Sequence, residues 1–108
     1  MKEKALVYIS KEYVYKKKYE EVLLKFIPLY SYVLCRFNVT IPKELTKAGI
    51  SFELIDKAFL YNFLRDEASL IIIFYDLEDN HAQDLIKYCT KHSKPFLIIN
   101  NPLDDWDL

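Results

Sequence analysis

The stretch YDLEDNHAQDL, residues 75–85, holds the densest group of side chains that could carry out acid–base chemistry or bind a metal. It directly follows the apolar run LIIIF. A carboxylate beside an imidazole, which titrates near neutral pH, is a typical acid–base pair. Mg²⁺ and Ca²⁺ prefer carboxylate oxygens as ligands. The catalytic candidates are Asp76, His81 and Asp84, and the weaker metal candidates are Asp76, Glu78 and Asp79.

The same stretch also has a purely structural interpretation. Asp79 or Asn80 is a good N-cap for a helix, and acidic side chains in a first helical turn interact favourably with the helix dipole. No second histidine and no cysteine stands nearby, so a zinc site is not expected. A capping turn therefore explains the composition without any ligand, and the sequence itself requires no cofactor.

Short apolar runs that alternate with helix-like segments predict the elements that would position this stretch. The run at 70–75 is apolar on both alternations, which is typical of a strand covered on both faces. Gly49 suits the exit of a short helix that begins near Thr40. In the segment 56–66 we expect Ala58, Phe59, Phe63 and Leu60 to face inward. The predicted strands are 5–10, 31–37, 50–55, 70–75 and 96–100, and the main predicted helices are 14–27, 56–66 and 80–92.

These elements predict a single α/β domain over residues 1–100, followed by an acidic tail at 101–108. The expected fold is a doubly wound, mainly parallel, five-stranded Rossmann-like sheet of order 3-2-1-4-5, with helices on both faces. Ligands of such sheets bind beyond the carboxyl ends of the strands, where the winding reverses. The loops that begin at Ser10 and at Asp76 should meet at that point, so the opening stretch lies where a site is expected.

The segment 67–100 resembles the C-terminal half of the SLOG superfamily, the Rossmann-like domains related to DprA and to the LOG phosphoribohydrolases. Ala68-Ser69 followed by LIIIFYD matches the family's strand, and Ser93-Lys94-Pro95-Phe96 matches the entry of its last strand. The resemblance is mostly architectural and extends over residues 1–100. It implies a nucleotide-like ligand or hydrolysis of an N-glycosidic bond.

The chain departs from the SLOG pattern at each of the family's phosphate-binding turns. Ser10-Lys11 stands where the family has Gly-Ser-Arg, and Asn38 lies near its Gly-Gly turn. Asp79-Asn80-His81-Ala82 replaces Ser-x-Gly-Thr, which puts His81 in the glycine's place. Each change adds a side chain where the family presents bare backbone to phosphate. The resemblance implies these ligand-binding positions: Ser10, Lys11, Asn38, Asp76, Asp79, Asn80 and His81.

Glycine content and charge exclude several common functions. The chain has one glycine in 108 residues and contains neither a G-x-G-x-x-G nor a P-loop motif, so ordinary dinucleotide or triphosphate binding is not expected. The formal net charge is −1, which predicts no general attraction to nucleic acid or membrane. No segment approaches the roughly 20 apolar residues of a membrane span, and the apolar part of MKEKALVYIS is too short for a signal peptide. We therefore expect a cytoplasmic protein.

Three further features have alternative interpretations. The segment KEYVYKKKYEE at 11–21 interleaves lysines with tyrosines, and these side chains can contact phosphates and bases. Its glutamates reduce the positive charge and favour a solvated start of a helix. Nucleic-acid binding is therefore not expected. Trp106 in the acidic tail either docks on a partner or folds back onto the domain. Cys35 and Cys89 lie in apolar contexts, which favours reduced core thiols over a disulfide or a reactive thiol.

Two functions of different classes follow from the sequence. The first is a non-catalytic binding protein that acts through protein contacts or a nucleotide-like ligand. The alternative is a small enzyme that acts on a nucleotide or nucleoside N-glycosidic bond, with Asp76, His81 or Asp84 as acid or base. The missing glycines and the lack of a clear carboxylate pair favour the first. The aromatic content of 16% in so small a domain also predicts a protein partner or a homodimer.

Overall fold

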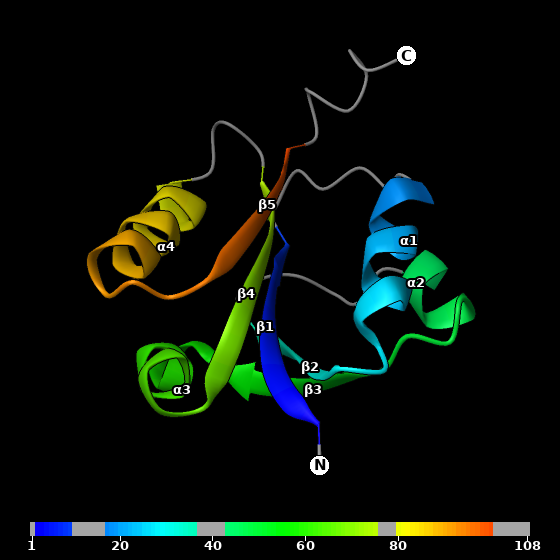
Figure 1. The fold of residues 1–108 in the computed structure, drawn as a ribbon, viewed down its shortest axis with the longest axis horizontal. Helices are drawn as coiled ribbons and strands as arrows, with labels where there is room; N and C mark the ends of the chain where they lie inside the picture. Colours follow the sequence, from blue (N-terminus) through cyan, green and yellow to red (C-terminus); the bar gives the residue numbers. More distant parts are fainter. Residues whose placement is uncertain (1, 10–16, 37–42, 76–79, 101–108) are drawn as a thin grey trace.

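The structure of the protein, a computed structural model, describes residues 2–9, 17–36, 43–75 and 80–100 (Figure 1). The predicted strands are all present among these residues, and the predicted helices agree to within a few residues at each end. The elements in chain order are β1 (Glu3–Ile9), α1 (Lys17–Phe26), β2 (Tyr30–Arg36), α2 (Lys43–Lys47), β3 (Phe52–Asp56), the 3₁₀ turn η1 (Lys57–Phe59), α3 (Leu60–Asp66), β4 (Ala68–Tyr75), α4 (Asn80–Lys91) and β5 (Phe96–Asn100).

The five described strands form one sheet in the order β3-β2-β1-β4-β5, which confirms the predicted order 3-2-1-4-5. All four neighbouring pairs are parallel. A parallel sheet must be covered on both faces, because its connections place helices there. The helices accordingly lie on both faces of the sheet (Figure 1). The α/β Rossmann-like architecture is thus established.

β1 is the central strand of the sheet and is deeply buried. It pairs with β2 on one side and with β4 on the other. Its residues from Ala5 to Ile9 are at most 4% exposed. A strand that is apolar on both alternations, such as ALVYI, is stable only when both of its faces are covered. The composition of β1 therefore accounts for its place in the middle of the sheet.

Alternate side chains of the strands contribute to two separate apolar layers. Leu6, Ile71 and Ile73 face the layer that contains the buried side chains of α3 and α4. Val7 and Ile72 face the opposite layer, which receives the buried side chains of α1 and α2. Figure 1 shows the same division, with α3 and α4 on one side of the sheet and α1 and α2 on the other.

The prediction for the inward face of residues 56–66 is partly wrong. Phe63 and Leu60 are buried as expected, but Ala58 is exposed and Phe59 is 59% exposed. The segment begins with the 3₁₀ turn η1 and becomes an α-helix only at Leu60. A 3₁₀ turn has about three residues per turn rather than 3.6, so the positions before Leu60 no longer share the inward face of α3. Leu64 takes the buried place instead.

Two helices end in the same hydrogen-bonded motif. At α2, the amide of Ile50 donates to the carbonyl of Leu45 at 3.1 Å, and Gly49 has φ of 88°. At α4, the amide of Lys94 donates to the carbonyl of Cys89 at 2.9 Å, and Ser93 has φ of 55°. This is the Schellman arrangement, which requires a left-handed residue just after the helix. Gly49 confirms the predicted helix exit, whereas Ser93 adopts the same conformation with a side chain.

The left-handed conformation of Ser93 predicts that Ser93→Gly stabilises the protein. A left-handed conformation costs an L-residue about 1–2 kcal/mol, and the added flexibility of glycine in the unfolded chain removes part of that gain. We expect the free energy of unfolding, measured by urea denaturation, to rise by about 0.5–1 kcal/mol. Ser51→Gly is the matched control at an exposed serine whose φ is not positive, and it should not raise the free energy of unfolding. Equal effects of the two substitutions would contradict this explanation of the helix end.

Candidate functional site at the carboxyl edge of the sheet

The winding of the sheet reverses between β1 and β4. The connections from β1 run through α1 to β2 on one side, whereas β4 lies on the other side of β1 and continues to β5. Ile9 and Phe74 are register partners at the carboxyl ends of the two strands. The chain therefore leaves both strands at neighbouring points of the same edge. In open α/β sheets this is where ligands bind.

α4 begins at this edge and brings three of the predicted site residues with it. Asn80 is its first residue, and Asn80, His81 and Asp84 are all exposed. Its first turn contains no acidic side chain. The position before Asn80, where a capping side chain would stand, is Asp79 and lies outside the described residues. The N-terminus of α4 presents partly positive amide groups to this edge of the sheet.

The orientation of His81 and Asp84 follows from the helical repeat of α4. Ala82, Leu85 and Cys89 are buried against the sheet. His81 and Asp84 are three residues apart, which places them close together on the helix surface, and His81 lies at the border of the buried stripe, four residues before Leu85. The structure thus brings together one imidazole and one carboxylate from the predicted set, and both face solvent.

The remaining predicted site residues lie outside the described residues. These are Ser10 and Lys11 after β1, Asn38 after β2, and Asp76, Glu78 and Asp79 after β4. The predicted stacking segment at 11–16 and the tail with Trp106 also lie outside. Their assignment to a site stays a prediction.

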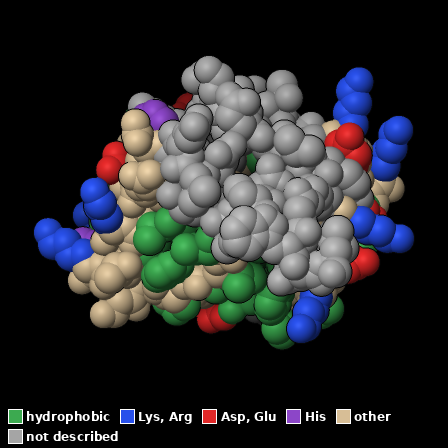
Figure 2. All heavy atoms as spheres, turned by 90° about the horizontal axis from the view of Figure 1, so that it is seen from above, with side chains coloured by type: hydrophobic (Ala, Val, Ile, Leu, Met, Phe, Trp, Pro, Cys, Tyr) green, Lys and Arg blue, Asp and Glu red, His purple; other side chains and the backbone are tan. Residues whose placement is uncertain are grey.

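Within the described ranges, no group of three or more His, Cys, Asp or Glu side chains is arranged to hold a metal ion. None of the described helices is long and apolar enough to cross a membrane. Figure 2, which looks onto the carboxyl edge, shows the described lysine and arginine side chains mainly at the two flanks of the molecule.

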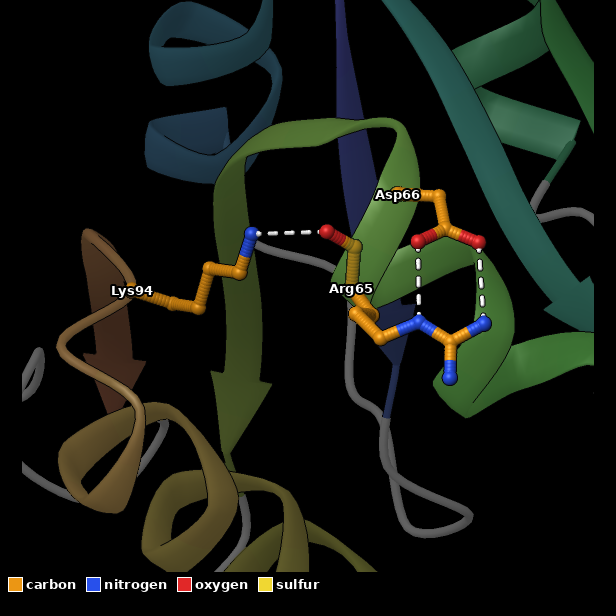
Figure 3. Close-up of polar contacts among 3 residues, drawn as sticks. All are labelled: Arg65, Asp66 and Lys94. Carbon is orange, nitrogen blue, oxygen red and sulfur yellow. Dashed lines mark hydrogen bonds and ion pairs between the residues drawn. The ribbon is translucent and has the colours of Figure 1, made fainter.

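The opposite, amino edge of the sheet carries a network of polar contacts that the sequence analysis did not predict (Figure 3). The guanidinium of Arg65 donates two hydrogen bonds to Asp66, at 2.8 and 3.0 Å. Lys94 donates from Nζ to the main-chain carbonyl of Arg65 at 3.3 Å. This contact places a cation at the C-terminal end of α3, where the helix dipole favours it. Lys4 and Glu67 form an ion pair of 3.2 Å at the same edge.

The Arg65–Asp66 pair shifts the titration of both partners. The hydrogen bond to Asp66 raises the pKa of Arg65, and the same bond lowers the pKa of Asp66 below its ordinary value. Both side chains are more than half exposed, and exposed ion pairs contribute little to stability. The network is therefore a surface feature that joins α3 to the loop before β5, and nothing in it resembles a catalytic group in a cleft.

An open hollow of about 410 Å³ also lies at the amino edge. It is lined by residues from the starts of β1, β2 and β3, including Lys2, Tyr30, Tyr32, Gly49 and Glu53. A second shallow hollow shares Lys2 and Tyr30 with it. Ligands of doubly wound sheets bind at the other edge, beyond the carboxyl ends of the strands, so these shallow hollows lie away from the expected site.

Two buried groups have strongly raised pKa values, and both belong to the core. Burial raises the pKa of the Cys89 thiol to about 11. Burial also raises the pKa of Tyr32 to about 12, and its hydroxyl donates to the main-chain carbonyl of Leu23 in α1. Cys89 is 1% exposed in the layer under α3 and α4, in agreement with the predicted core role. The side chain of Cys35 is not among those that the structure describes.

Comparison with known proteins gives no relatives for this chain. No family model matches it, and neither do any of the curated proteins or solved structures that were searched. The SLOG resemblance stays a prediction from the sequence, and the structure establishes the fold alone.

The burial of Cys89 predicts that its thiol does not react with alkylating reagents in the folded protein. The thiolate is the reactive form, and a pKa of about 11 leaves the thiol protonated at pH 8.5. We expect iodoacetamide at pH 8.5 to leave Cys89 unmodified in the folded chain and to modify it fully in urea. Because the folded pKa is raised, reactivity should increase as the pH rises toward 11. Peptide mapping by mass spectrometry separates Cys89 from Cys35. Equal labelling of Cys89 with and without urea would show that the thiol is accessible.

Proposed function

We propose that the protein is a non-catalytic binding domain that takes a nucleotide-like ligand at the carboxyl edge of its sheet, between β1 and β4. The observation that carries the proposal is the reversal of the winding at this point, with Ile9 and Phe74 as neighbours. The ligand would lie beyond these strand ends and against the start of α4. Contacts with other proteins would involve a different part of the sheet, its outer strands.

The start of α4 supports an anionic or strongly polar ligand. Its first turn carries no acidic side chain, and Asn80 and His81 are exposed there. An amide and an imidazole can hydrogen-bond to the base, the sugar or the phosphate of a nucleotide. The helix N-terminus adds a favourable dipole for negative charge. The acidic residues at 76, 78 and 79 oppose a multiply charged phosphate, so a nucleoside or monophosphate fits the proposal better than a triphosphate.

The exposure of the acid–base candidates supports binding rather than catalysis. Acid–base groups of enzymes are typically set in partly buried surroundings that shift their titration and exclude water. His81 and Asp84 are both exposed on the surface of α4. Among the described residues, no other carboxylate joins them to form a metal-binding group.

A hydrolase of an N-glycosidic bond is the second candidate. The spacing of His81 and Asp84 on one side of the first turns of α4 is the observation that favours it, because an imidazole and a carboxylate can act as acid and base. The two proposals differ in one product. The enzyme releases free base from a nucleoside or nucleotide, whereas the binding domain releases none.

A thermal-shift screen tests the proposed binding. We expect AMP, GMP, adenosine or guanosine to raise the unfolding midpoint, because a ligand selective for the folded state stabilises it. At about ten times the dissociation constant the gain is about 1.4 kcal/mol, which corresponds to roughly 5–10 °C for a domain of this size. MgCl₂ alone is included to detect a cation site. No shift with any of these nucleotides and nucleosides would overturn the proposal.

Two histidines at opposite ends of α4 provide a matched pair of variants. His81→Ala should remove most of the ligand-induced shift, because His81 lies at the start of α4. His92→Ala, an exposed histidine just after the other end of α4, should leave the shift unchanged. Chromatography of the incubated nucleosides serves as the assay for free base. Release of base that Asp84→Asn abolishes would favour the enzyme over the binding domain.

A further inference from the structure

The last strand, β5, is one edge of the described sheet, and its outward backbone groups can be identified. The amide of Ile71 donates to the carbonyl of Pro95 at 3.1 Å, and Ile71 is the register partner of Phe96. In a parallel ladder, alternate residues direct both backbone groups toward the same neighbour. Leu97 and Ile99 therefore bond to β4. The amides and carbonyls of Phe96, Ile98 and Asn100 point away from it.

β5 carries no charged side chain, no internal proline and no bulge, three of the features by which natural proteins protect an edge strand. Charged side chains, proline within the strand and bulges usually prevent the pairing of exposed edges. The sequence of β5 is FLIIN, and its register with β4 is regular. The opposite edge strand, β3, reads FELID, and its Glu53 and Asp56 are exposed. The two edges thus differ in charge, although each carries one exposed aliphatic residue: Ile98 is 39% exposed on β5, and Leu54 is 40% exposed on β3.

The helix beside this edge is also uncharged on the relevant flank. The ring of Tyr88 lies 4.3 Å from that of His92 and 5.0 Å from that of Tyr61, measured between centroids, so this flank of α4 faces α3. The helical repeat of 100° per residue places Ile86 and Thr90 on the opposite flank, away from α3. Ile86 is partly buried and Thr90 is exposed. A second copy approaching along β5 would meet no like charge from these residues.

We propose that two copies of this chain pair through their β5 strands, antiparallel about a two-fold axis at Ile98. The axis sets Ile98 opposite Ile98 of the other copy, and Phe96 opposite Asn100. All three residues have outward backbone groups, so each can form the hydrogen-bonded type of antiparallel pair. The two five-stranded sheets then become one continuous sheet. The pairing is self-complementary, as a two-fold interface requires.

A second copy suits this edge better than an unrelated peptide. The outward groups at Phe96, Ile98 and Asn100 are symmetric about Ile98, so the strand matches its own reverse. The two Ile98 side chains meet on one face of the joined sheet and bury apolar surface that is exposed in one copy alone. This dimer involves neither His81 nor the strand ends at Ile9 and Phe74, so it is independent of the proposed ligand.

Sedimentation velocity on the whole chain tests the dimer. The native protein should sediment with twice the mass of one chain, and Ile98→Glu should convert it to a monomer, because the axis brings two carboxylates together. Leu54→Glu is the matched control on the charged edge strand β3, with nearly the same exposure, and it should remain dimeric. Circular dichroism verifies that both variants are folded.

Hydrogen exchange provides a second measurement that needs no variant. In the dimer the amide of Ile98 is bonded to the other copy, so it should exchange slowly at high protein concentration and quickly on dilution. A native chain that is monomeric at every concentration would overturn the proposal. A dimer in which the Ile98 amide exchanges freely, or one that Leu54→Glu dissociates while Ile98→Glu does not, would overturn it equally. Failure of nucleotides to bind would leave this result unaffected.

Discussion

The burial of β1 on both faces and both edges is the constraint on which the rest of the structure depends. Five successive residues, Ala5 to Ile9, are shielded from solvent, and that requires a strand on each side and a helical layer above and below. Parallel neighbours need crossover connections, and right-handed crossovers from a central strand place helices on opposite faces of the sheet. The layers under α1 and α2 and under α3 and α4 are the direct consequence.

Because helices cover both faces of the sheet, we expect the functional surfaces to lie at its edges. Among the described residues, apolar side chains of the helices and strands cover the two faces of the sheet, which leaves its carboxyl edge, its amino edge and its two outer strands uncovered by these layers. The carboxyl edge contains the point where the winding reverses and the start of α4. The amino edge holds ion pairs and carbonyl contacts, which join neighbouring elements. The two outer strands differ in charge, and β5 is the one suited to pairing.

Much of the fold could be predicted because the strands are short apolar runs between polar segments. LIIIF and ALVYI are apolar on both alternations, and this composition places them in the interior of the sheet. The predicted helix over 80–92 is found at Asn80–Lys91, because Ala82, Leu85 and Cys89 recur at helical spacing. Ala58 and Phe59 were predicted wrongly, since local spacing does not show that a 3₁₀ turn precedes α3.

The point where the winding reverses could be predicted from the sequence, but the polar contacts around the sheet could not. The switch point follows from strand order, and the exposure of His81 and Asp84 follows from the helical repeat. The contact between Lys94 and the Arg65 carbonyl spans 29 residues, and its acceptor is a main-chain atom, so no local pattern indicates it. The outward groups of β5 likewise become visible only once its hydrogen bonds to β4 are known.

The most direct test of the binding site is a map of amide chemical-shift changes on adding the nucleotide or nucleoside that stabilises the protein most. We expect the changes to concentrate at Ile9, Phe74, Asn80 and His81, around the reversal of the winding. Changes concentrated instead at Lys2, Tyr30 and Gly49, which line the hollow at the amino edge, would contradict it.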